Sequence, residues 1–318
     1  MTSASPGLPI AAPTAGGRAR SRLGRKVFDG FVTACLASCA TFSILTTLAI
    51  IVVLAVETVR FFALPEVSFV EFISGTEWNP LLGATKHFGI WPLICGTFLV
   101  TVVAMLVAIP FGLVTAIYLS EYAPRGVRAV IKPVLEVLAG VPTVVYGFFA
   151  LTVITPFLRN ISSTFEIYNV FSAGLAVGIM CLPIVCSMSE DALRAVPVSL
   201  RAGAYGVGAT KFDVSVKVVV PGALSGIVAA SLLAIARAVG ETMIVALAAG
   251  NLARMTLDVR EGAQTMTAYM VQIFLGDASN FGPEYFSSYA VAATLFIITF
   301  LFTVLGHRIR VRFREVYE

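Results

Sequence analysis

Long apolar runs constrain the fold of this chain more than any other feature of its sequence. Six of them cover approximately residues 29–59, 90–119, 133–158, 169–188, 223–249 and 286–306. A run of about 20 apolar residues crosses the hydrocarbon layer as a helix, and these runs lack the alternation typical of barrel strands. Only 13% of the 318 residues are charged, where a soluble domain carries about 25%. We therefore predict an all-α membrane protein with six transmembrane helices.

The distribution of Lys and Arg predicts the orientation of these helices. If the N-terminus is inside, 16 of the 22 Lys and Arg residues flank the inner ends of the runs and five flank the outer ends. Positive charge collects on the cytoplasmic side of membrane proteins, so we expect both termini to be cytoplasmic. Residues 1–27 are rich in Ala, Pro, Gly and Ser and predict a disordered cytoplasmic tail. The transmembrane domain then covers 28–310, and a short cytoplasmic tail covers 311–318.

Two charges interrupt the apolar stretch between Gly226 and Gly250. Arg237 and Glu241 are four residues apart and share one face of a helix. An arginine near the bilayer centre costs roughly 2.5–3.5 kcal/mol on insertion scales, so it requires a partner, water or a charged substrate. Either Arg237 is a structural partner of Glu241, or it contacts an anion that crosses the membrane. We favour the second interpretation, because a guanidinium group offers a planar fork of donors.

Proline and glycine fall within three of the runs. Each proline removes a backbone hydrogen bond that protein or cavity water must replace. We expect breaks in these spans, which would suit helices that line a pathway, although ordinary kinks would explain any single proline equally well. The residues concerned are Pro110 and Gly112 in the second run, Pro133, Gly140, Pro142 and Gly147 in the third, and Pro183 in the fourth.

The loop between the first two runs is rich in aromatic residues. Tryptophan and other aromatic side chains are enriched where the membrane meets water. We therefore expect an interfacial belt formed by Phe69, Phe72, Trp78, Phe88 and Trp91.

The longest predicted inner loop, 189–221, has the pattern of ordered structure. Residues 198–206 predict a short helix, and Gly206 to Ala209 predict a turn. Thr210 and Asp213 form a capping pattern that opens a second helix. We call 189–221 the coupling loop, because a short helix held below the membrane could transmit movement. Near it, the i,i+4 pairs Lys132–Glu136 and Glu190–Arg194 are expected to be ordinary interfacial or solvated pairs.

The coupling loop resembles the E-A-A-x3-G-x9-I-x-L-P pattern of ABC-importer permeases. The E-A-A positions are Ala202, Gly203 and Ala204, the glycine is Gly208, and the final positions are Val218, Val220 and Pro221. Ala202 replaces the acidic residue of that pattern. For contact with the ATPase, we therefore expect Arg201 or Arg194 to supply charge instead.

Three further segments resemble the permeases of phosphate-specific ABC importers, and in particular their PstC-type subunit. They are Phe88–Pro124, Pro133–Leu151 and Ala236–Asn251. The resemblance implies a type I ABC-importer permease in a prokaryotic cytoplasmic (inner) membrane. It also implies a PstA-type second permease, two copies of a cytoplasmic ATPase and an extracytoplasmic protein that delivers inorganic phosphate. Arg237 and Glu241 correspond to the arginine and glutamate implicated in phosphate passage in that family.

For Glu241 two roles remain open at this point. It could orient Arg237 and moderate its charge, or it could accept the proton of monohydrogen phosphate, which sulfate lacks at neutral pH.

The sequence predicts a transporter subunit rather than an enzyme. It contains no G-x-x-x-x-G-K-[ST] motif, since Gly203 to Gly208 is followed by Ala209. We therefore expect no cofactor or metal in this chain and place ATP and Mg on the partner ATPase. Membrane lipid is an expected contact, and nucleic acid is not. The alternative is a self-contained secondary anion transporter or channel that uses the same charged pair, but such a carrier needs no coupling loop.

Overall fold

The structure is a computed structural model that describes residues 16–81, 86–277 and 282–312. The chain divides into two compact units, Met1–Val53 and Leu54–Glu318, with helix α1 (Gly16–Phe62) running across the boundary. The predicted tails, 1–27 and 311–318, lie partly outside the described residues and stay predictions, although the described part of the first, residues 16–27, is helical as the start of α1. Within α1, the hydroxyl groups of Thr33, Thr41 and Thr46 donate to carbonyl groups four residues earlier. These polar groups are thereby satisfied inside an apolar helix.

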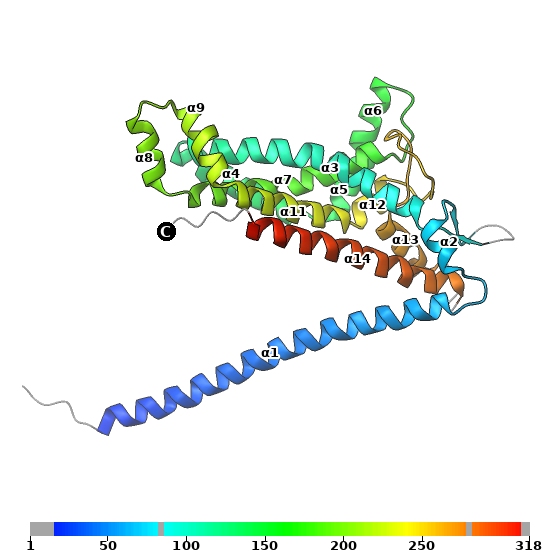
Figure 1. Cartoon of the computed structure of the whole chain (residues 1–318), viewed down its shortest axis with the longest axis horizontal. Coiled ribbons are helices and arrows are strands. Elements are labelled where there is room, and N and C mark those ends of the chain that lie inside the picture. The colour runs from blue at the N-terminus through cyan, green and yellow to red at the C-terminus, as the bar shows by residue number, and fades with distance from the viewer. Residues whose placement is uncertain (1–15, 82–85, 278–281, 313–318) are drawn as a thin grey trace, which may run out of the picture. The chain divides into compact units, whose positions relative to one another are not determined.

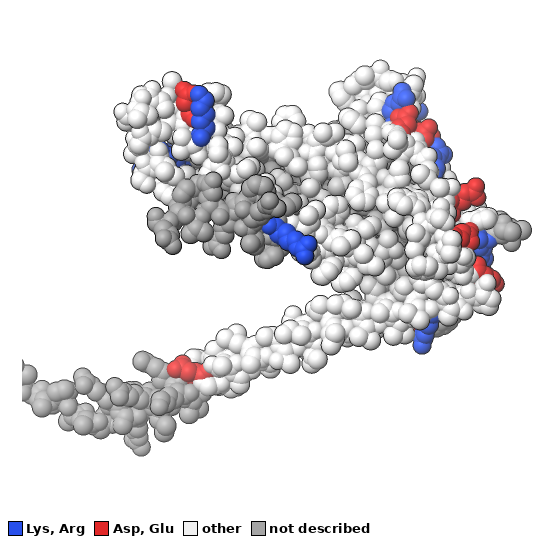
Figure 2. All heavy atoms as spheres, in the orientation of Figure 1, with Lys and Arg blue, Asp and Glu red and all other residues white. Residues whose placement is uncertain are grey.

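Within the described residues, five helices are long and apolar enough to cross a membrane, or six if one bent pair counts as a single span. The predicted number of six spans agrees with the upper count. The five are Phe28–Phe62, Trp91–Tyr122, Thr143–Ile161, Val170–Ala195 and Pro283–Gly306, and the bent pair is Lys211–Gly222 with Leu224–Val239, at 68°. On the face shown in Figure 2, most charged side chains of the second unit lie toward its two ends.

The centre of the second unit is the pair α3 (Trp91–Ile117) and α7 (Val170–Ala195). Glycine allows these helices to approach closely. A Cβ atom at Gly174 would lie 2.6 Å from the Cβ of Val103, and one at Gly112 would lie 2.8 Å from the Cβ of Val185. Small residues at a membrane helix interface permit this packing. Helix α11 (Leu224–Val239) packs beside the pair (Figure 1).

The predicted break in the second span is wrong. Helix α3 continues through Pro110 and passes into a π-helical turn, η1 (Tyr118–Tyr122). Gly112 serves close packing against α7 rather than a break. In α7, Pro183 also lies inside a continuous helix. Neighbouring helices can hold a turn that has lost one hydrogen bond.

The third predicted span, 133–158, is wrong at its start. Residues Arg125–Gly140 form a separate helix, α4, and the chain then turns at Val141 and Pro142. Pro142 disfavours helical backbone at the residue before it, and Val141 is extended with ψ 129°. The membrane-crossing segment begins only after this turn, as α5 (Thr143–Phe149), η2 (Ala150–Ile154) and α6 (Thr155–Ile161).

The fifth predicted span, 223–249, is also interrupted. Helix α11 ends at Val239, and a short helix, α12 (Met243–Ala248), follows after three residues. Arg237 therefore lies in the last turn of α11, and Glu241 lies in the break itself.

The coupling loop is largely helical. Its first residues extend α7 to Ala195, and α8 (Val198–Gly206) coincides with the predicted helix. The Oγ1 of Thr210 accepts from the backbone N–H of Asp213, which confirms the predicted cap. The rest of the segment forms α9 (Lys211–Val214), η3 (Ser215–Val219) and α10 (Val220–Gly222). Figure 1 shows α8 and α9 together at one end of the helices of the second unit.

Short elements gather at the opposite end of the second unit (Figure 1). Strands β1 (Trp78–Asn79) and β2 (His87–Phe88) pair in antiparallel fashion. Phe72 and Phe88 make edge-to-face contacts with Phe61, and Trp78 makes one with Phe72. All three are buried, so for them the predicted interfacial belt is wrong. Phe69 and Trp91 are exposed. The remaining elements are α2 (Phe69–Ser74), α13 (Met266–Gln272), η4 (Ile273–Asp277) and α14 (Pro283–Arg312).

Candidate translocation and coupling sites

The interruption of the fifth span places Glu241 between the end of α11 and the start of α12. The backbone N–H of Gly240 still bonds to Ala236, but Glu241 and Thr242 leave the helix. A break exposes carbonyl groups that need new partners in a membrane. The hydroxyl of Thr267, in α13, donates to the carbonyl of Glu241 at 2.6 Å. The break is therefore held by a tertiary contact.

The carboxylate of Glu241 connects the two halves of the span. Its Oε2 accepts from Nη1 of Arg237 at 2.7 Å, and its Oε1 accepts from the backbone N–H of Ile244 at 3.4 Å. The side chain is only 2% exposed, and a buried carboxylate is costly unless it is paired and hydrogen-bonded. Because both oxygens have partners within the chain, this geometry favours an orienting role for Glu241 over direct acceptance of a substrate proton.

Arg237 remains accessible despite this ion pair. Its side chain is 41% exposed, and its second terminal nitrogen lies 3.4 Å from the sulfur of Met180. A thioether is a weak acceptor, so the guanidinium group keeps donors for a stronger one. The predicted ion pair therefore forms, and the buried carboxylate of Glu241 fixes the accessible guanidinium group of Arg237.

The residues predicted for ATPase coupling do not share one environment. Ala202, Gly203 and Gly208 are exposed, whereas Ala204 is half-buried against an apolar cluster that includes Val214. Gly208 has φ +87°, a left-handed conformation that favours glycine. It ends the turn in which the N–H of Ala209 bonds to the carbonyl of Ala204. Pro221 lies in α10, directly before the chain bends into α11.

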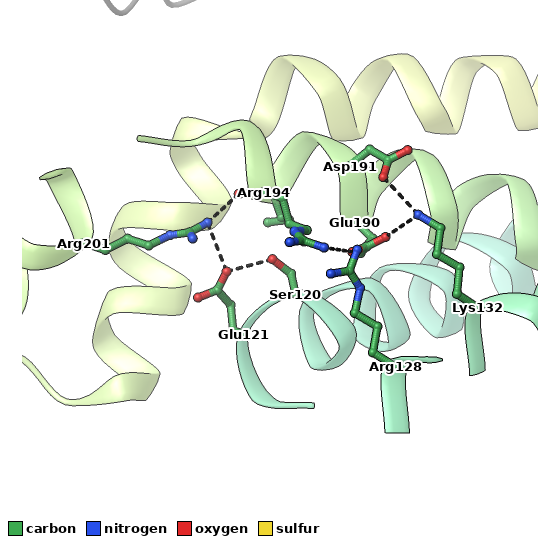
Figure 3. Close-up of polar contacts among 9 residues, drawn as sticks. Ser120, Glu121, Arg128, Lys132, Glu190, Asp191, Arg194 and Arg201 are labelled. Atoms are coloured by element: carbon green, nitrogen blue, oxygen red, sulfur yellow. Dashed lines mark hydrogen bonds and ion pairs between the residues drawn. The ribbon is translucent and has the colours of Figure 1, made fainter. Parts of the chain in front are cut away.

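The exposed surface of α8, α9 and the turn between them is largely apolar, with Lys211 as an exposed basic residue of α9. Val198, Val207 and Phe212 are 73%, 86% and 68% exposed, and Tyr205 is also exposed. Arg201 instead points inward. Its Nη2 lies 3.2 Å from Oε1 of Glu121 in η1 and donates to the carbonyl of Leu193 at 2.7 Å (Figure 3). The predicted contact with the ATPase relied on the charge of Arg201 or Arg194, and the exposed apolar side chains were not assigned to that contact.

Glu190 is a further buried charge that was predicted to be solvated. The structure contradicts this, because its side chain is 1% exposed. It accepts from Arg128 at 2.6 Å and Lys132 at 3.3 Å, both on α4, and lies 3.5 Å from Arg194 (Figure 3). Lys132 thus pairs with Glu190 and Asp191, and the predicted Lys132–Glu136 pair is replaced. The i,i+4 spacing could not reveal contacts between α4 and α7.

These contacts also shift the proton affinity of Lys132. Burial by itself lowers the pKa of its ammonium group. The hydrogen bond and negative charge of Glu190, together with those of Asp191, outweigh this effect, so the pKa lies above its ordinary value. Lys132 therefore keeps its charge at neutral pH and remains a partner for Glu190.

Within the described residues, no cluster of three or more His, Cys, Asp or Glu side chains could hold a metal ion. The two sites consist of a fixed, accessible cation near a helix break and a helical segment joined to the bundle by ion pairs.

Residues 108–315 match the family described as binding-protein-dependent transport system inner membrane component. This chain belongs to that family. The matched region includes α8, Arg237 and Glu241. The chain is therefore a multi-pass inner membrane protein and a transmembrane pore subunit of an ABC importer, and the predicted all-α permease fold is confirmed.

Curated relatives cover most of the chain. The probable ABC transporter permease protein YqgH of Bacillus subtilis is 34% identical over 84% of this chain and 86% of its own length. The phosphate transport system permease protein PstC of Mesorhizobium japonicum is 32% identical over 76% of this chain and 78% of its own. The PstC protein of Xylella fastidiosa strain Temecula1 is 33% identical over 76% and 79%.

Solved structures share the fold. A bacterial alginate ABC transporter in complex with an alginate-pentasaccharide-bound periplasmic protein has a TM-score of 0.63 at 13% identity, covering 92% of this chain and 98% of that one. The MetNI methionine ABC transporter, in an inward-facing form, has a TM-score of 0.53 at 21% identity, covering 71% and 95%. At these identities the likeness concerns architecture alone.

Proposed function

We propose that this permease subunit carries inorganic phosphate into the cell in an ATP-driven importer. The observation that carries the proposal is Arg237, an accessible guanidinium group fixed by the buried carboxylate of Glu241 beside the break in the fifth span. Its planar fork matches the oxygens of phosphate. The similarity to relatives named phosphate transport permeases, over about three quarters of the chain, supports the same cargo.

The partners follow from the same proposal. A PstA-type permease completes the pore, two copies of an ATPase bind ATP and Mg, and an extracytoplasmic protein delivers phosphate. The related alginate transporter, described in complex with a periplasmic protein, supports an external delivery partner. With both termini cytoplasmic, α8, α9 and the turn between them face the ATPase, and the exposed apolar side chains of Val207 and Phe212 are available to it.

A single arginine suits a transport path. The charge of Arg237 is already partly balanced by Glu241, so phosphate is held less tightly there than by an unpaired arginine. A site in a pore has to bind strongly enough for cargo to enter and weakly enough for it to leave. Movement of α8 would reach Arg237 through α9, η3 and α10, which lead without a long loop into α11. The family match and this coupling segment favour ATP-driven import over a self-contained carrier.

Reconstitution tests the proposal. The chain is co-expressed with its partner permease and ATPase, and the complex is placed in proteoliposomes. The binding protein is added on the side of the membrane opposite the ATPase. We expect labelled phosphate uptake that requires both ATP and the binding protein, and no matching uptake of labelled sulfate. Uptake driven by an ion gradient without ATPase subunits would instead support a carrier, and equal uptake of sulfate would contradict phosphate as the cargo.

A further inference from the structure

Two carboxylates are buried at the α8 end of the second unit, apart from the Arg237–Glu241 pair. The side chain of Glu121, in η1, is 8% exposed and that of Glu190, in α7, is 1% exposed. Each pairs with cations from another element: Glu121 with Arg201 of α8, and Glu190 with Arg128 and Lys132 of α4. Figure 3 shows the two groups side by side. Removal of one partner from a buried ion pair is strongly destabilising, so these pairs force the joined elements to move together.

Arg201 joins α8 to the two central helices. One nitrogen, Nη2, contacts both Glu121, in the η1 turn that continues α3, and the carbonyl of Leu193, in the last turn of α7. The hydroxyl of Ser120 also donates to Glu121 at 2.8 Å. Nε of Arg201 is buried and has no hydrogen-bond partner in the part of the chain that the structure describes. Such an unmet donor costs free energy, and a second arrangement of α8 could relieve it.

Glu190 joins α7 to α4. None of the residues of α4, all of which the structure describes, is buried. Its attachment therefore depends on the partial packing of side chains such as Leu135 and on the ion pairs that Arg128 and Lys132 make with Glu190. Glu190 lies three residues before Leu193, so both joints meet on the last turns of α7.

From α4 the contacts continue to the translocation site. The hydroxyl of Tyr146, in α5, donates to the carbonyl of Leu138, in α4, at 2.8 Å. At Gly147 the backbone of α5 approaches α12 so closely that a Cβ atom would lie 3.1 Å from the Cα of Ile244. The N–H of Ile244 in turn donates to Glu241, the partner of Arg237.

We propose that Glu121 and Glu190 are positioning residues that transmit the movement of α8 to α12. The chain itself leads from α8 through α9, η3 and α10 to α11, the first half of the interrupted span. The ion-paired route reaches the second half, through α4 and α5. Movement of α8 thus acts on both sides of the break that holds Arg237 and Glu241. This inference rests on the proposed function, since it assigns a role within ATP-driven import.

The test uses the complete reconstituted complex and measures phosphate uptake per ATP hydrolysed. We expect Glu121→Gln and Glu190→Gln, which keep the side-chain shape, each to lower this ratio about tenfold, within the usual range of coupling between sites. The conservative variants Glu121→Asp and Glu190→Asp, which keep the negative charge, should hold the ratio within about threefold of the unmodified complex. The control is Asp258→Asn, which removes an ion pair with Arg260 on the loop after α12, outside the α8–α11 segment, and should leave the ratio unchanged.

Three outcomes would overturn the inference: an unchanged ratio in both Gln variants, a proportional fall of uptake and hydrolysis, or failure of both variants to assemble, since the last two indicate a purely structural role. The cargo assignment is read separately, from the unmodified complex. If that complex hydrolyses ATP on addition of the binding protein but takes up no phosphate, phosphate is the wrong cargo. In that case the role of Glu121 and Glu190 is measured as the increase in ATP hydrolysis caused by the binding protein. The Gln variants should still weaken this increase.

Discussion

At the scale of single residues, Arg237 is a charged side chain that is accessible and also held in place. Its orientation is fixed by the carboxylate of Glu241, which is itself buried. We expect Arg237→Gln to lower phosphate uptake on the order of a hundredfold, because hydrogen bonds to charged groups contribute about 1.5–3 kcal/mol and each 1.4 kcal/mol is a factor of ten. Arg237→Lys should recover only a small part, since lysine lacks the planar fork.

The measurement is labelled uptake in proteoliposomes, with co-purification of the partner permease and ATPase as the assembly control. If the Arg237 variants fail to assemble, the pair is structural and the proposed contact with phosphate is refuted.

Glu241 is the second residue-scale test. Glu241→Gln removes the negative charge and leaves one acceptor oxygen in place of two, so only one of the bonds from Arg237 and Ile244 can persist. If the carboxylate orients Arg237, uptake should fall about tenfold, by the loss of one charge-assisted hydrogen bond, and the preference for phosphate over sulfate should persist. Competition of labelled phosphate uptake with unlabelled sulfate measures this preference. A loss of preference with uptake preserved would favour the proton-acceptor role instead.

At the scale of elements, the turn after α8 offers a test in which two glycines can be compared. Gly208 has φ +87°, whereas Gly206 ends α8 without a positive φ, and a Cβ carbon added at either position would meet no described neighbouring group within 4 Å. Gly208→Ala therefore introduces backbone strain of about 1–2 kcal/mol without a steric clash. We expect it to lower uptake several-fold, while Gly206→Ala leaves uptake unchanged.

The measurement is phosphate uptake per assembled complex. If Gly208→Ala and Gly206→Ala lower uptake equally, side-chain bulk rather than the conformation of the turn determines uptake.

The helical elements also show how far the sequence determines this fold. The capping pattern of Thr210 and Asp213 and the helix 198–206 were predictable because they depend on neighbouring residues. The separate helix α4 was missed because hydropathy merges it with α5, and only Pro142 indicates the boundary. The spacing of Arg237 and Glu241 predicted their pair, but not the helix break beside it. The burial of Glu121 and Glu190 depends on contacts between helices far apart in sequence, which no local pattern records.

At the scale of the whole molecule, the proposed mechanism requires that α8 and the loop after α12 lie on opposite sides of the membrane. Lys and Arg counts predict α8 inside and this loop outside. Val207 and Leu257 are 86% and 82% exposed and suit single-cysteine labelling at these two places. A membrane-impermeant maleimide should label Leu257→Cys in intact spheroplasts and Val207→Cys only in inverted vesicles. The unmodified chain, with its five native cysteines, gives the background. The reverse pattern would place α8 outside, beyond reach of a cytoplasmic ATPase, and would refute ATP-driven coupling through this segment.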